Sequence, residues 1–286
     1  MRTTLLAAAF ATAAQLTSAA TLDPLPWTDL VVFGDSLSDQ GNFGPGRIAT
    51  NGDTWATQLG ATSWIEGGTN YAFLGATAAD DPNSVDFDDQ RDLFRDAPPD
   101  LGSDPLVVIY FGGNDLFNNP SEAGIAAAIQ AIGAGVAELT AEFGLTRYAF
   151  LSLIDLGLIP RFAGTPEAPL ATAASLAFND ALEVFADSGE SLGLDLTYVD
   201  IEALVDTVLA DPSSFGFSDV TGTCERGAIS CDGFLFWDDS HPTEAAHSFV
   251  AQTVLEAVSP APVPLPASVW LFAGGLVLLV AARRTA

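Results

Sequence analysis

Two apolar stretches of the chain each end in a glycine-containing polar turn, and this pairing constrains the fold more than any other feature. Residues 29–33 and 105–111 are short, apolar and rich in valine, as strands buried on both faces of a parallel sheet are. Gly-Asp-Ser follows the first stretch, and Gly-Gly-Asn-Asp follows the second. Open α/β enzymes place their chemistry at the carboxyl ends of such strands. The sequence therefore predicts reactive groups at Ser36 and Asn114.

Strand and helix patterns alternate along the rest of the chain, which predicts an α/β fold. We expect a doubly wound, three-layer α/β/α sandwich around a five-stranded parallel sheet of order 2-1-3-4-5. In this order the first and third strands are neighbours, and the crevice between their ends is the topological switch point. The expected strands are 29–33, 62–65 (a weak pattern), 105–111, 147–153 and a stretch from Leu194, and the main expected helices are Glu122–Phe143, 168–185 and 242–258.

The segment 238–243, Asp-Asp-Ser-His-Pro-Thr, supplies what a serine nucleophile requires. A serine hydroxyl needs an imidazole to accept its proton and a carboxylate to fix the imidazole tautomer. His241 and Asp238 can provide both, although Asp239 competes as the orienting carboxylate. The other histidine of the chain, His247, falls inside a helical pattern, which is typical of a structural histidine.

Four blocks of the sequence resemble the GDSL-type, or SGNH, serine esterases and lipases, in that family's order. They are Gly34-Asp-Ser-Leu37, the segment from Asn70 to Gly75, Gly112-Gly-Asn-Asp115, and Asp238-x-x-His241. The resemblance implies an SGNH-hydrolase fold with Ser36 as the nucleophile, His241 as the base and Asp238 as the orienting acid. It also implies an oxyanion hole made by the backbone N–H groups of Ser36 and Gly75 and by the side chain of Asn114.

A second serine motif competes with Ser36. Gly189-Glu-Ser-Leu-Gly193 matches the Gly-x-Ser-x-Gly elbow of α/β-hydrolases, which follows a strand and precedes a helix. Here a helical pattern precedes the motif and an alternating, strand-like pattern follows it at 194–200. We therefore interpret Ser191 as part of a helix-to-strand connection.

Both ends of the chain have the composition of targeting signals. Residues 1–20 combine an early arginine, an apolar region and a small-residue cleavage site, so we expect a secretory signal peptide. Residues 21–258 form one predicted catalytic domain. Residues 259–286 contain Val-Pro-Leu-Pro-Ala, an apolar run and two arginines, and resemble the VPLPA-type PEP-CTERM sorting signals of Gram-negative bacteria. A helix over 267–282 would be about 24 Å long, and a short transmembrane anchor is the alternative interpretation.

This tail implies two partners, an inner membrane that holds the chain transiently and a processing protease that cuts it. We expect an exported protein, secreted or displayed at the cell surface. All nine basic residues are arginine, and without the two ends six of them face 37 acidic residues, a formal charge of −31. Such a surface repels phosphate backbones, which argues against a nucleic-acid partner.

The two cysteines fit an exported protein as well. Cys224 and Cys231 flank a short loop just before Asp238, and in an oxidising compartment we expect them to form a disulfide. Two cysteines without clustered histidines do not make a zinc site, so we predict no metal. No organic cofactor is implied either.

Together the motifs predict a carboxylic-ester hydrolase that acts on lipid or short acyl esters through an acyl-enzyme intermediate. A carbohydrate O-deacetylase acting on surface polysaccharide is the alternative among enzymes. A catalytically silent surface-binding protein is the alternative from another class. The loops 41–61 and 80–104 are expected to shape the substrate pocket.

Overall fold

A parallel four-stranded sheet forms the centre of the computed structural model, which describes residues 25–44, 46–224 and 230–259. The strands β1 and β2 are buried along their whole length, as their uninterrupted apolar sequences require. Val32 of β1 pairs with Val108 of β2, and Val108 pairs with Ala149 of β3. The strands lie in chain order: β1 (Leu30–Gly34), β2 (Leu106–Tyr110), β3 (Arg147–Leu151) and β4 (Asp195–Val199).

The sheet differs from the predicted five-stranded one at the edge beside β1. Residues 62–65 form no strand, because the 3-10 helix η1 (Trp64–Glu66) begins within them. The predicted place of the second strand is taken by residues 69–73, which bond to β1 in an extended but irregular way. The Tyr71 N–H donates to the Val32 carbonyl (2.7 Å), and the Val32 N–H donates to the Thr69 carbonyl (2.9 Å).

Asn70 explains why this edge segment stops short of a regular strand. Its side chain donates to the Ser38 carbonyl (2.7 Å) and accepts from the Ala72 N–H (3.1 Å), so the local chain bonds to a side chain instead of a ladder. The pairing with β1 is reduced to a single bridge between Val32 and Asn70. The first and third predicted strands, now β1 and β2, are nevertheless neighbours as predicted.

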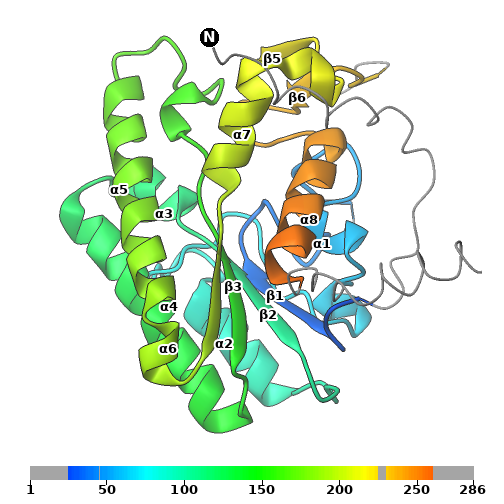
Figure 1. The fold of residues 1–286 in the computed structure, drawn as a ribbon, viewed down its shortest axis with the longest axis vertical. Helices are drawn as coiled ribbons and strands as arrows, with labels where there is room; N and C mark the ends of the chain where they lie inside the picture. Colours follow the sequence, from blue (N-terminus) through cyan, green and yellow to red (C-terminus); the bar gives the residue numbers. More distant parts are fainter. Residues whose placement is uncertain (1–24, 45, 225–229, 260–286) are drawn as a thin grey trace, which may run out of the picture.

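Helices cover both faces of the sheet and give the three expected layers (Figure 1). On one side α4 packs between α2 and α5, and on the other side α8 packs against α1 and the strands β3 and β4. Among the described residues α4 is the one helix long and apolar enough to cross a membrane, and here its apolar stripe lies in the core. These helices are α1 (Trp55–Gln58), α2 (Phe87–Asp96), α4 (Glu122–Phe143), α5 (Ala168–Asp187) and α8 (Glu244–Val258).

A small second sheet supports the loop that carries His241. Its strands pair in parallel, and the Trp237 N–H just after them donates to the His241 carbonyl (2.8 Å). The predicted disulfide between Cys224 and Cys231 is confirmed and lies between the two strands along the chain. The remaining elements are α3 (Gly113–Asn118), η2 (Leu156–Leu158), α6 (Gly189–Leu192), α7 (Ile201–Ala210), η3 (Pro212–Phe215), β5 (Asp219–Thr223) and β6 (Phe234–Phe236).

Two predictions fall on residues that the structure does not describe. The signal peptide at 1–20 lies entirely outside the described residues, and the sorting tail at 259–286 does so from residue 260 onward. Both remain predictions from the sequence.

Candidate active site

Ser36 lies in a tight turn directly after β1. The Ser38 and Asp39 N–H groups both donate to the Asp35 carbonyl (3.0 Å each), so the chain reverses immediately beyond the strand. Gly34 permits this turn to approach β2, because a Cβ at this position would lie 3.0 Å from both Ser38 Oγ and the Tyr110 carbonyl oxygen. The turn thus holds Ser36 at the carboxyl edge of the sheet, beside the end of β2.

The structure brings Ser36, His241 and Asp238 into one hydrogen-bonded line. Ser36 Oγ lies 2.8 Å from His241 Nε2, and His241 Nδ1 lies 2.8 and 2.9 Å from the two carboxylate oxygens of Asp238. A carboxylate beside Nδ1 keeps the ring proton on that nitrogen, which leaves Nε2 free to accept from the serine O–H. This is the arrangement that makes a serine hydroxyl nucleophilic.

Asp238 is the carboxylate that contacts the ring. Its Oδ1 also accepts from the Ser240 N–H (2.9 Å) and the His241 N–H (2.8 Å). Burial alone would raise the pKa of Asp238, but the hydrogen bond and charge of the His241 ring, together with the backbone N–H bonds of Ser240 and His241, outweigh it, and the net pKa is lowered. The carboxyl of Asp239 instead accepts from the Ser240 hydroxyl, so it takes no part in this line.

The three expected oxyanion donors come from three different segments. Asn114 is the second residue of α3, directly after β2, and its Nδ2 donates to the Ala76 carbonyl (2.8 Å). Gly75 adopts a positive φ of 79° in the loop that Asn114 thereby holds. Within the described residues neither the Gly75 N–H nor the Ser36 N–H donates to any acceptor. Both amides are therefore available to a substrate oxygen.

Asp35 is a buried carboxyl beside this site that was not among the predicted site residues. Only 2% of the residue is exposed, and burial raises its pKa from 3.8 to about 7. The Leu37 N–H and the charge of His241 lower the pKa by less, and Asp115 raises it further. Asn114 Nδ2 also lies 3.4 Å from Asp35 Oδ2. Its position between Gly34 and Ser36 was the one sequence feature that could have indicated a role for this carboxyl. The sequence pattern does not indicate that the carboxyl is buried.

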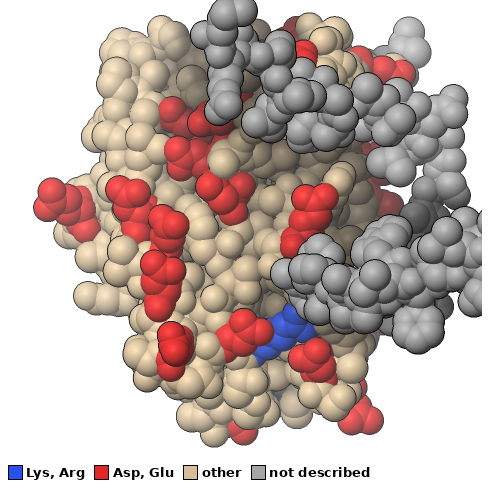
Figure 2. All heavy atoms as spheres, viewed as in Figure 1, with Lys and Arg blue, Asp and Glu red and all other residues tan. Residues whose placement is uncertain are grey.

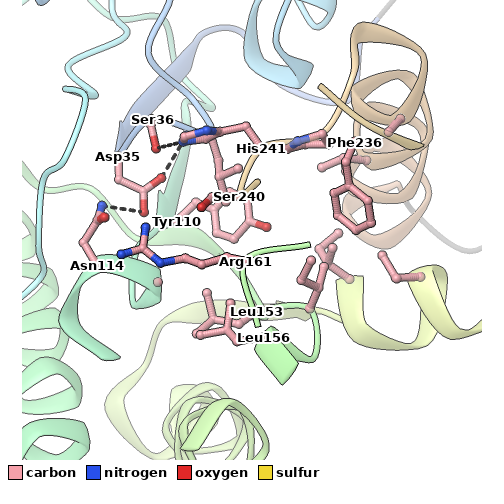
Figure 3. Close-up of a pocket in the computed structure, with 18 of the residues that line it drawn as sticks. Asp35, Ser36, Tyr110, Asn114, Leu153, Leu156, Arg161, Phe236, Ser240 and His241 are labelled. Carbon is pink, nitrogen blue, oxygen red and sulfur yellow. Dashed lines mark hydrogen bonds between the residues drawn. The ribbon is translucent and has the colours of Figure 1, made fainter. Parts of the chain in front are cut away.

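A cavity of about 170 Å³ opens beside Ser36 and is polar at one end (Figure 3). Ser36, Asn114 and His241 lie at the polar end, together with Asp35, Arg161 and Ser240. Most of the remaining wall is apolar and comes from the segment after β3 and from α7, β6 and α8, with Leu153, Leu156, Ile201, Val205, Phe236 and Val250 as examples.

The prediction that residues 41–61 and 80–104 shape the pocket is wrong for this cavity, because neither loop contributes a residue to its wall. Packing of the helices and strands in the carboxyl-terminal half produces the wall instead. This packing brings together side chains that are far apart in the sequence.

Ser191 and His247, the alternative serine and histidine, are not part of the hydrogen-bonded line of Ser36, His241 and Asp238. Ser191 lies on the short helix α6 between α5 and β4, and its hydroxyl donates to the Ser188 carbonyl (2.7 Å). His247 is buried on α8, where burial and, secondarily, the charge of His241 lower its pKa to about 3. Its ring therefore stays neutral at physiological pH.

In the described part of the chain no three His, Cys, Asp or Glu residues form a metal-ligand group.

The serine lies at the end of a strand in a parallel sheet that is flanked by helices, and a histidine and a carboxylate lie in line with it. This is the arrangement of a serine hydrolase. The chain belongs to the GDSL-like lipase/acylhydrolase family, whose model matches residues 30–254.

The chain is similar to two named bacterial proteins over most of its length. The chain is 27% identical over 320 residues to esterase EstA of Pseudomonas aeruginosa, covering 86% of this chain and 49% of the relative. It is 24% identical over 280 residues to the thermolabile hemolysin of Vibrio parahaemolyticus, covering 83% and 65%. It thus spans about half to two thirds of the length of these relatives. A solved acetyl xylan esterase variant of Geobacillus stearothermophilus matches at 14% identity and a TM-score of 0.49, over 83% of this chain and 97% of that one.

Proposed function

We propose that this protein is a serine hydrolase that cleaves carboxylic esters through an acyl-enzyme intermediate. The observation that carries the proposal is the 2.8 Å contact between Ser36 Oγ and His241 Nε2, with Asp238 on the other ring nitrogen. His241 accepts the serine proton as Oγ attacks the ester carbonyl, and it returns that proton to the leaving alcohol. A water molecule activated by the same nitrogen then attacks the acyl-enzyme and releases the acid.

The negative charge that develops on the carbonyl oxygen requires donors that are already in place. In this proposal they are the N–H groups of Ser36 and Gly75, which have no acceptor in the described structure, and Nδ2 of Asn114. Deleting one such donor typically raises the barrier by about 3–4 kcal/mol. The contact between Asn114 Nδ2 and the Ala76 carbonyl supports the proposal because it fixes the amide, and the 3.4 Å contact of the same nitrogen with Asp35 Oδ2 places it beside the serine turn.

The apolar cavity favours an acyl chain of several carbons. Each methylene that moves from water into such a wall contributes about 0.8 kcal/mol of binding free energy. An acetyl group has no chain to place there, so the cavity argues for lipid or short acyl esters over a carbohydrate O-deacetylase. A non-catalytic surface-binding protein would not need the proton relay at all.

We further propose that residues 21–258 act as one catalytic domain that is exported by a signal peptide at 1–20 and processed at the 259–286 tail. The disulfide between Cys224 and Cys231 supports an oxidising compartment. The acidic surface, seen over the face in Figure 2, is compatible with export. Membrane fractionation and intact mass of the native protein test the processing step. A mature chain that still ends at Ala286 in the membrane would favour the permanent anchor.

The hydrolase proposal is tested with the full chain and two matched serine variants. Ser36→Ala should abolish ester hydrolysis and labelling by a fluorophosphonate probe. Ser191→Ala removes an exposed hydroxyl that is bonded only to the backbone, and it should keep both. A p-nitrophenyl ester series from acetyl to decanoyl then separates the substrate classes, because the cavity predicts rising kcat/KM beyond acetyl. A Ser36→Ala variant that is still labelled and active would refute the mechanism, and a preference for acetyl would favour the deacetylase.

A further inference from the structure

Arg161 is an arginine without a carboxylate partner in a chain of formal charge −28. Acidic side chains are spread over the face shown in Figure 2, and basic ones are scarce there. Most of the described arginines are neutralised accordingly: Arg91, Arg95 and Arg147 each contact two or more carboxylates. Among the described residues the Arg161 guanidinium forms neither an ion pair nor a hydrogen bond.

Aromatic rings and the backbone hold Arg161 in place without neutralising its charge. The Arg161 N–H donates to the Asp239 carbonyl (2.8 Å), which ties this residue to the loop that carries His241. Its guanidinium carbon lies 4.6 Å from the centroid of the Phe117 ring and 5.8 Å from that of Phe162. Stacking on a ring face orients the planar group and leaves its N–H edge free to donate.

The guanidinium lies at the polar end of the cavity. Arg161 lines the same cavity as Ser36 and Asn114, and in Figure 3 its side chain extends toward Asn114 and Asp35. Asp35 lines the same end of the cavity, but no ion pair joins it to Arg161 in the described structure, and burial raises the pKa of its carboxyl to about 7. The positive charge of Arg161 is therefore available to a ligand close to the reacting serine.

We propose that Arg161 binds an anionic group, a phosphate or a carboxylate, on the alcohol part of the ester substrate. The apolar side chains of the cavity suit the acyl chain, whereas Arg161 is exposed at the polar end beside Ser36, which leaves that end to the alcohol part of the ester. A guanidinium presents paired N–H groups that match the oxygens of either anion. This inference rests on the proposed ester hydrolase and names its substrate class.

The charge of the rest of the molecule makes this single arginine important. A strongly acidic surface repels an anionic substrate at long range, and salt screens that repulsion over about 8–10 Å. A fixed cation at the polar end of the cavity supplies attraction at short range, where screening is weakest. The site would thus select among esters by the charge of the alcohol while the surface stays acidic.

The kinetic test compares neutral and anionic esters that share one acyl group. The substrates are 1-hexanoylglycerol, its 3-phosphate, and the hexanoyl ester of lactate, and the readout is each anionic-to-neutral ratio of kcat/KM. Arg161→Ala should lower the phosphate or carboxylate ratio by about 10- to 100-fold, mainly through KM, because an anchor away from the carbonyl binds ground and transition states alike. Arg161→Lys should restore part of that ratio. The two anionic arms distinguish phosphate from carboxylate.

Arg47→Ala is the matched control, because Arg47 also stacks on a ring, that of Phe43, has no ion pair in the described structure, and does not line the cavity. It should leave both ratios within about twofold of the wild type. A change of less than about threefold in both ratios for Arg161→Ala would overturn the proposal, and so would an equal change in Arg47→Ala.

A binding measurement separates this inference from the hydrolase proposal. In the Ser36→Ala background, calorimetric titration with hexyl phosphate and hexyl succinate requires no turnover. Adding Arg161→Ala should weaken the binding of at least one of them about 10-fold or more, whereas hexanol binding serves as the uncharged reference. If the wild type hydrolyses no ester, the hydrolase proposal fails, yet loss of anion binding in Arg161→Ala would still support the anion site. Equal binding with and without Arg161 would refute it.

Discussion

Replacing the buried Asp35 with asparagine should change how the stability of the protein depends on pH. The carboxyl lies in the turn after β1, where its Oδ1 accepts from the Leu37 N–H (2.9 Å), and an asparagine carbonyl can accept the same bond. The side chains are nearly the same size, so the variant alters charge with little change in packing. Asp115, His241 and Tyr110 are the ionisable groups that interact with it.

The sign follows from where the proton is bound. Burial raises the pKa of Asp35 from 3.8 to about 7, so between these values the folded state holds a proton that the unfolded chain has lost. Stability contributed by this proton is fully present below pH 3.8 and is lost as the pH rises through about 7. A shift of about three units corresponds to about 4 kcal/mol, at 1.36 kcal/mol per unit. Asparagine has no such proton to lose.

The free energy of unfolding of Asp35→Asn, relative to the wild type, should therefore rise by up to about 4 kcal/mol between pH 4 and pH 8. Urea denaturation followed by tryptophan fluorescence measures this difference at each pH. Asp100→Asn is the control, because it removes the same charge from an exposed position. The change in its free energy of unfolding with pH gives the effect of removing one negative charge from this highly charged chain. A difference for Asp35→Asn that stays constant within about 0.5 kcal/mol, once this control is subtracted, would refute the reasoning.

Three other changes test the site and its support. Asn114→Ala should lower kcat by about 10²–10³ with intact folding by circular dichroism, and an unchanged kcat would exclude Asn114 as an oxyanion donor. Asp238→Asn should reduce turnover far more than Asp239→Asn, since only Asp238 contacts the ring; equal losses would contradict this. Reducing the Cys224–Cys231 disulfide should lower the free energy of unfolding by about 2–3 kcal/mol in urea, in proportion to its short loop, whereas an unchanged midpoint would show that the loop is held by other contacts.

The parts of the fold that the sequence predicted well are those governed by local patterns. Buried parallel strands have continuous apolar sequences, and α4 has the same bounds as predicted, Glu122–Phe143. The neighbouring strands β1 and β2 follow from one topological rule, and that rule places Ser36 and Asn114 at the same edge. His241 was identified by chemistry and by the scarcity of histidine, and the structure places it within hydrogen-bonding distance of Ser36.

The predicted second strand, residues 62–65, is absent for a reason that local propensity does not contain. Strand residues require partners along a ladder, and next to β1 the carbonyl of Ser38 and the N–H of Ala72 are bonded by the side chain of Asn70. Asn70 also belongs to the loop that carries Gly75. The same contacts that interrupt the strand thus hold a predicted oxyanion donor near the serine turn, so irregularity at this edge serves the site.

The cavity and its charged residues are missed by sequence reasoning because they depend on tertiary packing. The proposed reacting groups come from turns after β1 and β2 and from the loop before α8, whereas most of the apolar wall comes from the segment after β3 and from α7, β6 and α8. Short sequence motifs identify the proposed reacting groups, because the chemistry at each of these positions requires one residue type. The wall needs only apolar volume, which many sequences supply. In the proposed hydrolase, the residues that react and the residues that would select the acyl group can therefore vary separately, and Arg161 lies in the cavity beside both sets.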